Sequence, residues 1–356
     1  MGAAESAFPF TIEDEVTSWA HSHWKLYDGV EKSTSEKCSI FVFTLQGQSE
    51  EAIAAAKNCL LRLKTLKYPS VIRYKESAEL PDKLYVATEW IQPLNLSGCD
   101  EGERILGLFH VIKSLSFLHT DAKLLHGCIC PQSLFVTKAG DWKLGGFDLT
   151  SSSISTLFQA NLGLIPSRYQ APEIQKKDFN RLNEGPIWAA DSWALGCLIY
   201  ETFNGPLQRA QNLTRPGNIP QPLLTYYRGL LNTNVKQRLS PRKLGELPLF
   251  VNNPLVESMT FLSTLALKSN QEKKSFFINF ATHVNSFPDN ICKYGILPQL
   301  LDSLTYGAGL ACFAAILSAV LKIGKKLNEE EYALHITPSV IRLFTSNERA
   351  VRVCIL

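Results

Sequence analysis

Short apolar runs and longer amphipathic stretches alternate along the first part of the chain. Residues 38–43 (CSIFVF) are rich in β-branched and aromatic side chains, and residues 84–88 (LYVAT) are similar, so both are predicted to be strands. Between them, residues 50–66 place apolar side chains at helical spacing without Gly or Pro, and we expect this helix to end before Pro69.

A change from strand-rich to helix-rich patterns follows a polar loop at residues 95–103. Residues 104–119 and 188–203 have the apolar content and length of buried helices. Two short strands are expected between them, at residues 134–136 and 142–144. The pattern therefore predicts an α+β fold with a strand-rich part followed by a helix-rich part.

From about residue 253 onward only helical patterns occur. Residues 296–304 (ILPQLLDSL) resemble residues 336–344 (ITPSVIRLF), forty positions later, with proline and apolar positions coinciding. A forty-residue period of paired helices is typical of a HEAT-type solenoid. The alternative is a coincidence between two amphipathic helices. On the repeat interpretation the chain stops inside the next unit, so we expect a fragment or a shortened form.

A stretch free of formal charge for nineteen residues, at 303–321, approaches the length of a membrane span. It contains polar and glycine residues, however, and only its last twelve positions, 310–321, are densely apolar. Twelve apolar residues suit a buried core helix better than a span. We therefore expect the second, buried helix of a repeat here.

Charge and cysteine content narrow the class of protein. The chain has 36 Lys and Arg against 33 Asp and Glu, a net charge of +3, which is too weak to predict nucleic-acid binding. Nine cysteines occur, without a Cys-x-x-Cys pair, so we expect reduced thiols in a cytoplasmic protein. No basic segment followed by an apolar stretch begins the chain, so no secretory signal is expected.

The first residues, MGAAES, fit the N-myristoylation pattern with Gly2 as acceptor. An unmodified N-terminal tail is the alternative, because so short a motif also matches by chance. One myristoyl chain gives only marginal, reversible membrane binding, and no basic cluster follows to strengthen it. The sequence thus predicts at most a peripheral membrane contact.

Residues 25–250 resemble a protein kinase domain, with its segments in order. Residues 84–90 resemble the fifth strand running into the hinge, residues 169–173 (YQAPE) the Ala-Pro-Glu segment, and residues 191–201 (DSWALGCLIYE) the long F helix that begins at Asp191. The resemblance implies a bilobal fold in which Arg238 pairs with Glu173. Such a buried pair is structural.

The residues that this resemblance implies for catalysis are replaced. Phe41 stands where kinases have the lysine of the third strand, and Cys59 stands where they have its glutamate partner. In the catalytic loop, Cys128 replaces the base aspartate, Cys130 the lysine and Ser133 the metal-binding asparagine.

The metal-binding and phosphate-binding segments are also degenerate. Gly146 stands at the aspartate of Asp-Phe-Gly, with Asp148 two residues late. The glycine loop retains Gly29 as its one expected member. Phosphoryl transfer depends on positioned phosphates, metal ions and a base together, so we predict no enzymatic activity, no cofactor and no metal.

Two arrangements could restore part of the lost chemistry. Lys32 or Lys37 could reach into the site from a neighbouring strand, which leaves weak ATP binding or residual serine/threonine kinase activity as the alternative function. The segment His126-x-Cys128-x-Cys130 could hold zinc, but a structural zinc site needs four ligands and no fourth lies at ordinary spacing, the nearest histidine being His119.

A kinase-like domain followed by helical repeats resembles the Scy-like pseudokinases, also called N-terminal-kinase-like proteins. Residues 142–146 (WKLGG), residues 203–207 (FNGPL) and the PQLL helix at 298–301 carry this resemblance. The expected organisation is an N-terminal tail (1–24), an N-lobe (25–94), a C-lobe (95–252) and an incomplete repeat array (253–356).

The family resemblance implies a catalytically inactive scaffold or adaptor in vesicle traffic between the Golgi and the endoplasmic reticulum. It implies coat proteins as partners and a cytoplasmic location, peripheral to Golgi or endosomal membranes. Relatives linked to tRNA export also exist, although direct contact with nucleic acid is not predicted here. The sequence lacks the longer repeat array and the charged tail of full-length members.

Overall fold

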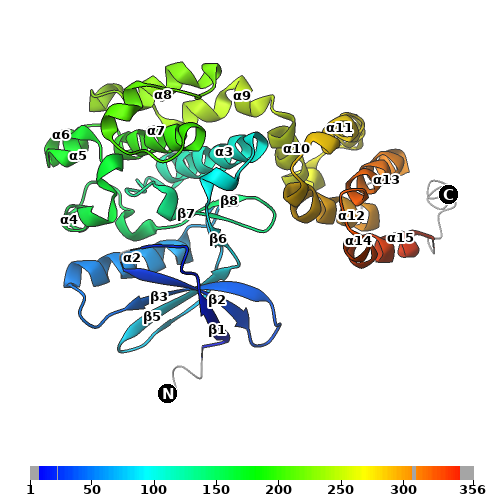
Figure 1. The fold of residues 1–356 in the computed structure, drawn as a ribbon, viewed down its shortest axis with the longest axis horizontal. Coiled ribbons are helices and arrows are strands. Elements are labelled where there is room, and N and C mark those ends of the chain that lie inside the picture. Colours follow the sequence, from blue (N-terminus) through cyan, green and yellow to red (C-terminus); the bar gives the residue numbers. More distant parts are fainter. Residues whose placement is uncertain (1–7, 22, 307–309, 345–356) are drawn as a thin grey trace. The chain divides into compact units, whose positions relative to one another are not determined.

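The structure, a computed structural model, describes residues 8–21, 23–306 and 310–344 (Figure 1). The chain forms two compact units. Unit 1 comprises residues up to 99, 107–137 and 142–249, and unit 2 comprises residues 100–106, 138–141 and 250 onward. Unit 1 has the two lobes of a protein kinase, and unit 2 is helical.

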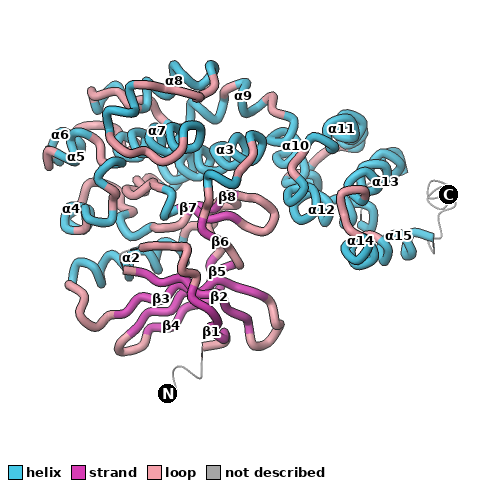
Figure 2. Tube along the Cα trace, viewed as in Figure 1, coloured by secondary structure: helices cyan, strands magenta, loops and turns pink. Residues whose placement is uncertain are grey.

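Five antiparallel strands form the N-lobe sheet, in the order β1-β2-β3-β5-β4 (Figure 2). Their bounds are β1 Phe10–Glu15, β2 Trp24–Glu31, β3 Lys37–Thr44, β4 Tyr74–Glu79 and β5 Lys83–Glu89. Side chains alternate along β3, where Cys38, Ile40 and Val42 join one apolar cluster of the sheet. Ser39, Phe41 and Phe43 are buried on the opposite face.

The N-lobe helix α2 runs from Glu50 to Thr65, as predicted. The Ser49 side chain accepts a hydrogen bond from the Ala52 amide and caps its first turn, where two glutamates also favour the positive end of the helix dipole. Small residues on one side allow close packing, and Cys59 and Leu63 continue this buried stripe.

The C-lobe is built on two long helices, α3 Glu101–Phe117 and α7 Ala189–Asn204, and on a small sheet with the order β6-β7-β8. The sheet contains β6 Gln92–Pro93, β7 Leu134–Val136 and β8 Trp142–Leu144, so both short strands were predicted correctly. Most of α7 is buried all round, as its apolar sequence predicts. Short helices complete the lobe: α4 Thr156–Ala160, α5 Pro172–Gln175, α6 Phe179–Asn183, α8 Leu224–Leu230 and α9 Pro248–Val251.

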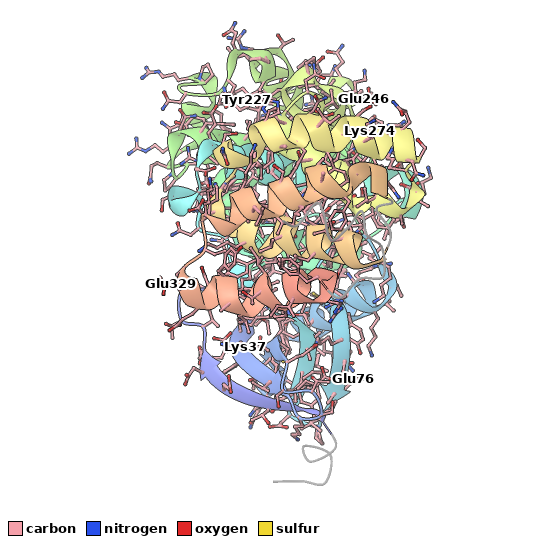
Figure 3. The ribbon with its side chains drawn as sticks, turned by 90° about the vertical axis from the view of Figure 1, so that its right-hand side faces the viewer. Lys37, Glu76, Tyr227, Glu246, Lys274 and Glu329 are labelled. Atoms are coloured by element: carbon pink, nitrogen blue, oxygen red, sulfur yellow. The ribbon has the colours of Figure 1, made fainter. Side chains whose placement is uncertain are left out.

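Unit 2 is a stack of helices that follow one another as layers in Figure 3, from α11 with the labelled Lys274 to α14 with the labelled Glu329. Helix α13 packs on α11 and α12, and α12 also packs on α15. The bounds are α10 Pro254–Ser263, α11 Asn270–His283, α12 Leu297–Tyr306, α13 Leu310–Gly324, α14 Glu329–His335 and α15 Thr337–Phe344.

Helix α13 covers most of the stretch that was weighed as a membrane span. It buries Ile316, Val320 and Ile323 completely, as expected of a core helix. Within the described ranges, no helix is long and apolar enough to cross a membrane.

Two short segments from earlier in the chain complete unit 2. Asn290 donates a hydrogen bond of 2.7 Å from Nδ2 to Oε1 of Glu103. The ammonium of Lys138 lies 4.1 Å from the centre of the Tyr294 ring. Sequence patterns assigned both segments to the C-lobe, because long-range contacts of this kind leave no local signal.

Two expectations about the N-terminal region are corrected. Residues 1–24 are not a tail throughout, because β1 lies within them; of its six residues only Phe10 is buried and even Ile12 is exposed, so the usual alternation is missing. Gly29 lies inside β2, paired with Ile12 on one side and Cys38 on the other, and is not part of a glycine loop. The loop that occupies this place is described at residues 16–21 and 23.

Candidate functional site

The loop between β1 and β2, described at residues 16–21 and 23, places the Trp19 indole against side chains of both lobes. The ring centre of Trp19 lies 5.5 Å from that of Phe41 and 5.7 Å from that of Phe135. Its Nε1–H donates a 3.0 Å hydrogen bond to the backbone oxygen of Gln132 in the catalytic-loop segment. The position that covers phosphates in a kinase is therefore held by an aromatic side chain.

Phe41 makes this aromatic contact continuous. Its ring meets that of Phe135 edge to face, with centres 5.5 Å apart, and it also contacts Trp19 and Trp24. Because its side chain is buried among rings, the position offers an apolar surface where a kinase offers an ammonium group. A phosphate here would lose its hydration without gaining a cation.

Ser39 binds both backbone polar groups of Ile91, in the segment that connects the lobes. Its hydroxyl donates to the Ile91 carbonyl and accepts from the Ile91 amide, both at 3.0 Å. In ligand pockets, a few backbone N–H and C=O groups of this kind bind and orient the ligand. One donor and one acceptor of the connecting segment are thus already paired inside the protein.

Asp148, which stands two residues late for a metal ligand, is buried and engaged. The Trp24 indole donates to its Oδ1 at 2.9 Å. The side-chain amide of Asn58 in α2 donates to the backbone oxygens of Phe147, Asp148 and Thr150 at 3.0–3.1 Å. Asp148 consequently fastens the N-lobe to this segment.

Cys59 lies on α2 beside Asp148. Burial raises the pKa of its thiol well above the ordinary value, and the charge of Asp148 acts in the same direction. A neutral thiol at this position agrees with the loss of its lysine partner at Phe41, because a buried glutamate without a cation would be costly.

The two cysteines of the catalytic-loop segment are also buried. The neighbouring Cys130 thiol raises the pKa of the Cys128 thiol well above its ordinary range, and burial adds to this effect. The Cys128 thiol donates to the Leu164 carbonyl at 3.2 Å. A protonated thiol that is already donating cannot accept the proton of an attacking hydroxyl.

Ser133 and Gly146 show why metal ligands do not fit here. The Ser133 hydroxyl donates to the Cys130 carbonyl at 2.8 Å and accepts from the Cys130 amide, so it closes its own turn. Gly146 has φ +70°, and a Cβ on it would come within 2.9 Å of the Ser133 Cβ. An aspartate at Gly146 would be strained in this backbone.

The structural positions of a kinase fold are occupied as in the family pattern. Arg238 donates to both carboxylate oxygens of Glu173, at 2.7 and 3.2 Å, and to the Ala189 carbonyl at 2.7 Å. Both side chains of the pair are buried. This buried pair ties the Ala-Pro-Glu segment to the start of α7.

Asp191 in α7 binds the backbone of the catalytic-loop segment. Its carboxylate accepts from the amides of His126 and Gly127, at 2.7 and 2.8 Å, and lies 2.8 Å from Nε2 of His119. Burial alone would raise the pKa of Asp191, but the hydrogen bond to His119 and its charge outweigh burial and lower it. The structural contacts of Asp191 and of the Arg238–Glu173 pair are thus retained although the catalytic residues are replaced.

The two rescues considered from the sequence find no support in the geometry. Lys32 donates to the Phe8 carbonyl at 2.8 Å, and Lys37 is exposed at the first position of β3. The His126 ring lies 2.8 Å from the Gly145 carbonyl, and the His119 ring faces Asp191. In the part of the chain that the structure describes, no three His, Cys, Asp or Glu residues are grouped to hold a metal.

The residues that fill the site and that the sequence did not predict are Trp19, Trp24, Ser39 and Asn58. Trp19 lay in the presumed tail, although an aromatic residue between two strands at the glycine-loop position was a usable signal. Ser39 gave no signal, because its bond to Ile91 spans 52 residues. Gly2 lies outside the described residues.

Known proteins share both the sequence and the fold. The family description "Protein kinase domain" matches residues 24–250. The Dictyostelium discoideum protein "Probable inactive serine/threonine-protein kinase scy1" is 35% identical over 99% of this chain and 44% of its own length. The mouse "Protein-associating with the carboxyl-terminal domain of ezrin" is 27% identical over 90% of this chain and 44% of its own length.

A solved structure agrees with the fold. The one titled "Crystal structure of Cex1p" has a TM-score of 0.64 at 17% identity and covers 100% of this chain and 73% of that chain. The chain spans about half the length of the curated relatives it matches. With the kinase scaffold retained and its chemistry replaced, the chain belongs to the protein kinase domain family and, within it, to the Scy-like pseudokinases.

Proposed function

We propose that this pseudokinase is a non-catalytic scaffold that presents protein-binding surfaces in vesicle traffic between the Golgi and the endoplasmic reticulum. One observation carries the non-catalytic part: Trp19 lies between Phe41 and Phe135 and bonds the Gln132 carbonyl, where substrate phosphates would be covered. The buried Arg238–Glu173 pair meanwhile keeps the lobe folded. Retained structure without the means of phosphoryl transfer favours binding over catalysis.

Thermal unfolding with ATP, with and without magnesium, tests the non-catalytic proposal. We expect no shift of the unfolding midpoint at millimolar nucleotide, because a ligand that binds only the folded state must raise it. A catalytically competent kinase domain measured alongside gives the positive control. A magnesium-dependent rise of several degrees would instead favour the alternative, a nucleotide-binding protein or a residual serine/threonine kinase.

We further propose that unit 2 is the beginning of a HEAT-type array. Support comes from the forty-residue period, because the two matching segments lie in α12 and α15 and these two helices pack on each other. Helices α11 and α13 pack as a second row. Equivalent helices that contact their equivalents in the next unit are the arrangement of a solenoid.

Vesicle-coat proteins are the partners we propose. The proposal rests on the family resemblance, and the name of the mouse relative, which refers to association with ezrin, supports a protein-binding role for the family. Affinity capture with the tagged chain from a membrane-containing lysate should recover coat subunits. Leu300→Asp is the informative variant, because Leu300 is fully buried in unit 2 and its charge should disrupt that unit.

Loss of the coat subunits with Leu300→Asp would assign the binding surface to unit 2, and unchanged recovery would assign it to unit 1. Absence of coat subunits from the capture with the unaltered chain would contradict the proposed partner. Lys236→Met, which changes an exposed ion pair, serves as the control that should leave capture unchanged.

A cytoplasmic location, peripheral to Golgi or endosomal membranes, accompanies this function. We propose that myristoylation at Gly2 contributes a weak, reversible contact. Intact-mass measurement of the protein from eukaryotic cells should show the acyl group, and Gly2→Ala should lack it and reduce the membrane-bound fraction. An unmodified N-terminus in the unaltered protein would remove this part of the proposal.

A further inference from the structure

A cavity of about 250 Å³ lies in unit 1, and none of the residues of the site described above lines it. Its walls come from the last turns of α3 and the π turn that follows, from the short helix Pro241–Glu246 and from the residues that precede β4. We call it the α3 groove and define it by Tyr68, Lys113, Phe117, Asp121, Arg242 and Glu246.

Three side chains four positions apart line one wall of the α3 groove: Lys113, Phe117 and Asp121. Residues at this spacing lie on the same face of a helix. A cation, an aromatic ring and an anion therefore follow one another along α3 and its π turn Leu118–Ala122. At about 1.5 Å per residue, the eight positions between Lys113 and Asp121 separate their backbones by about 12 Å.

Phe117 supplies the apolar middle of this row. Its ring stacks on that of Tyr68, with ring centres 4.7 Å apart and planes 13° from parallel. Both residues are half-buried, so part of this aromatic surface still faces water. An apolar side chain of a ligand that covers the remaining surface would be stabilised by its removal from water.

The two charges of the row are available to a ligand. The Lys113 ammonium lies 5.1 Å from the centre of the Phe109 ring, and the Asp121 carboxylate lies 3.0 Å from the Thr120 hydroxyl. Within residues 8–21, 23–306 and 310–344, neither Lys113 nor Asp121 forms an ion pair. Both are exposed, so pairing with a ligand would not require an existing ion pair to break.

The balance of charge in the α3 groove indicates what kind of ligand fits. Arg242 and Glu246, 3.8 Å apart and exposed, add one more cation and one more anion. A purely anionic ligand, such as a nucleic acid or a lipid headgroup, would meet the carboxylates of Asp121 and Glu246. A purely cationic ligand would meet Lys113 and Arg242. A ligand that carries both signs, with an apolar group between them, is matched along the whole row.

We propose that the α3 groove binds an extended segment of a partner protein with the pattern acidic–x–apolar–x–basic. Four steps of extended chain, at about 3.3 Å each, span about 13 Å, close to the separation of Lys113 and Asp121. The acidic side chain pairs with Lys113, the apolar one lies on Phe117 and Tyr68, and the basic one pairs with Asp121. The proposal rests on the scaffold role proposed above and adds the chemistry by which one partner segment is recognised.

Fluorine NMR titration of the full chain tests this proposal with three peptides. The mixed-charge probe is acetyl-Asp-Gly-Phe-Gly-Lys-amide with a para-fluoro group on its ring, and the two single-sign probes have Asp or Lys at both ends. We expect the mixed-charge probe to bind at least about threefold tighter than either single-sign probe at low salt, because a mismatched end replaces attraction by repulsion. The difference should vanish at about 0.5 M salt.

Charge reversal in the protein should reverse this preference. Lys113→Glu should bind the Lys-ended probe at least about threefold tighter than the mixed-charge probe, and Asp121→Lys should favour the Asp-ended probe in the same way. Lys243→Glu makes the same charge change at an exposed residue that does not line the groove, and its affinity should stay within about twofold of the unaltered chain. All three side chains are exposed, so the variants should unfold at nearly the same temperature as the unaltered chain.

Three results would overturn the proposal: no saturable binding of the mixed-charge probe up to about 10 mM, equal binding of the three probes by the unaltered chain, or an unchanged preference in both charge-reversal variants. The peptides contain neither nucleotide nor coat subunit. Failure here would therefore leave the results with ATP and the affinity capture standing, and failure of those experiments would leave peptide binding standing.

Discussion

Two ion pairs, one at Arg238 and one at Lys236, differ in their burial. Arg238 and Glu173 form a buried pair, and Lys236 and Glu184 form an exposed pair two positions away, with 64% and 65% of their side chains exposed. Each pair joins a basic residue to a glutamate, but Arg238 also donates to the Ala189 carbonyl, whereas Lys236 makes its contact with Glu184 at the surface. Their comparison therefore contrasts a buried, fully bonded ion pair with an exposed one.

Arg238→Met should lower the free energy of unfolding by about 3–5 kcal/mol, because it leaves the Glu173 carboxylate buried and unpaired. Lys236→Met should lower it by less than about 1 kcal/mol. Denaturant titration of both variants measures the difference. Similar losses for the two variants would mean that the buried pair is not a structural anchor.

A second residue-scale prediction concerns His21, whose ring stacks on Trp19. Nδ1 of His21 accepts hydrogen bonds from the amides of His23 and Trp24, both at 3.2 Å. An imidazole that accepts through Nδ1 is neutral. Burial lowers the pKa of His21, the charge of Asp148 opposes this change, and His23 adds to it. Burial likewise lowers the pKa of His126, with the charge of Asp191 opposing it.

A histidine whose pKa is lowered in the folded state stabilises the fold above its unfolded pKa of about 6.5. This stabilisation is lost as the pH falls through the pKa of the folded state. We therefore expect the free energy of unfolding to fall between pH 7 and pH 5. His21→Asn should reduce this slope by at most about 1.4 kcal/mol per pH unit, the effect of one proton. Denaturant titration of the unaltered chain and of His21→Asn between pH 7 and pH 5 measures this slope, and equal slopes would contradict the prediction.

Helices and strands with strong periodicity were predictable from the sequence, and elements stabilised by distant contacts were not. Helix α2 and strands β7 and β8 agree with their predicted ranges, because apolar spacing and capping residues are local signals. Strand β1 was missed because only Phe10 of its six residues is buried and its pairing partner is β2. The loss of catalytic groups was visible at single positions, but the packing of Trp19 against Phe41 and Phe135 depends on tertiary contacts.

Helix α13 gives a prediction at the scale of one element. Ile316 is fully buried, whereas Leu321 on the same helix has 44% of its surface exposed. Ile316→Ala should lower the free energy of unfolding of unit 2 by about 2–5 kcal/mol through the cavity it creates. Leu321→Ala should change it by about 0.5 kcal/mol or less. Helical circular dichroism during denaturation measures both, and equal effects would contradict a core position for α13.

At the scale of the whole molecule, unit 2 is assembled from three stretches of the chain. Residues 100–106 include Glu103, which accepts a hydrogen bond from Asn290, and Gly102, whose neighbours are Leu255 and Pro288. Residues 138–141 include Gly140, with φ +82°, beside Ile291. These two insertions depend on side chains that follow residue 249.

A chain that ends at Leu249 should therefore be less stable than its kinase-like sequence suggests. We expect its unfolding midpoint to lie several degrees, about 4 °C or more, below the first transition of the full chain, because the partners of residues 100–106 and 138–141 are gone. Differential scanning calorimetry of both chains measures this. Identical midpoints would show that these contacts contribute nothing to unit 1.

The threading of unit 2 through three stretches also affects how such a protein can be divided or recombined. A domain boundary placed where the family description ends would separate residues 100–106 and 138–141 from the helices they pack on. A domain exchanged at that point would therefore lack part of its packing partners. A recombined protein should fold only if the first turns of α3 and the residues before β8 come from the same parent as the helices of unit 2. The kinase-like half and its helical extension are therefore expected to be exchanged together.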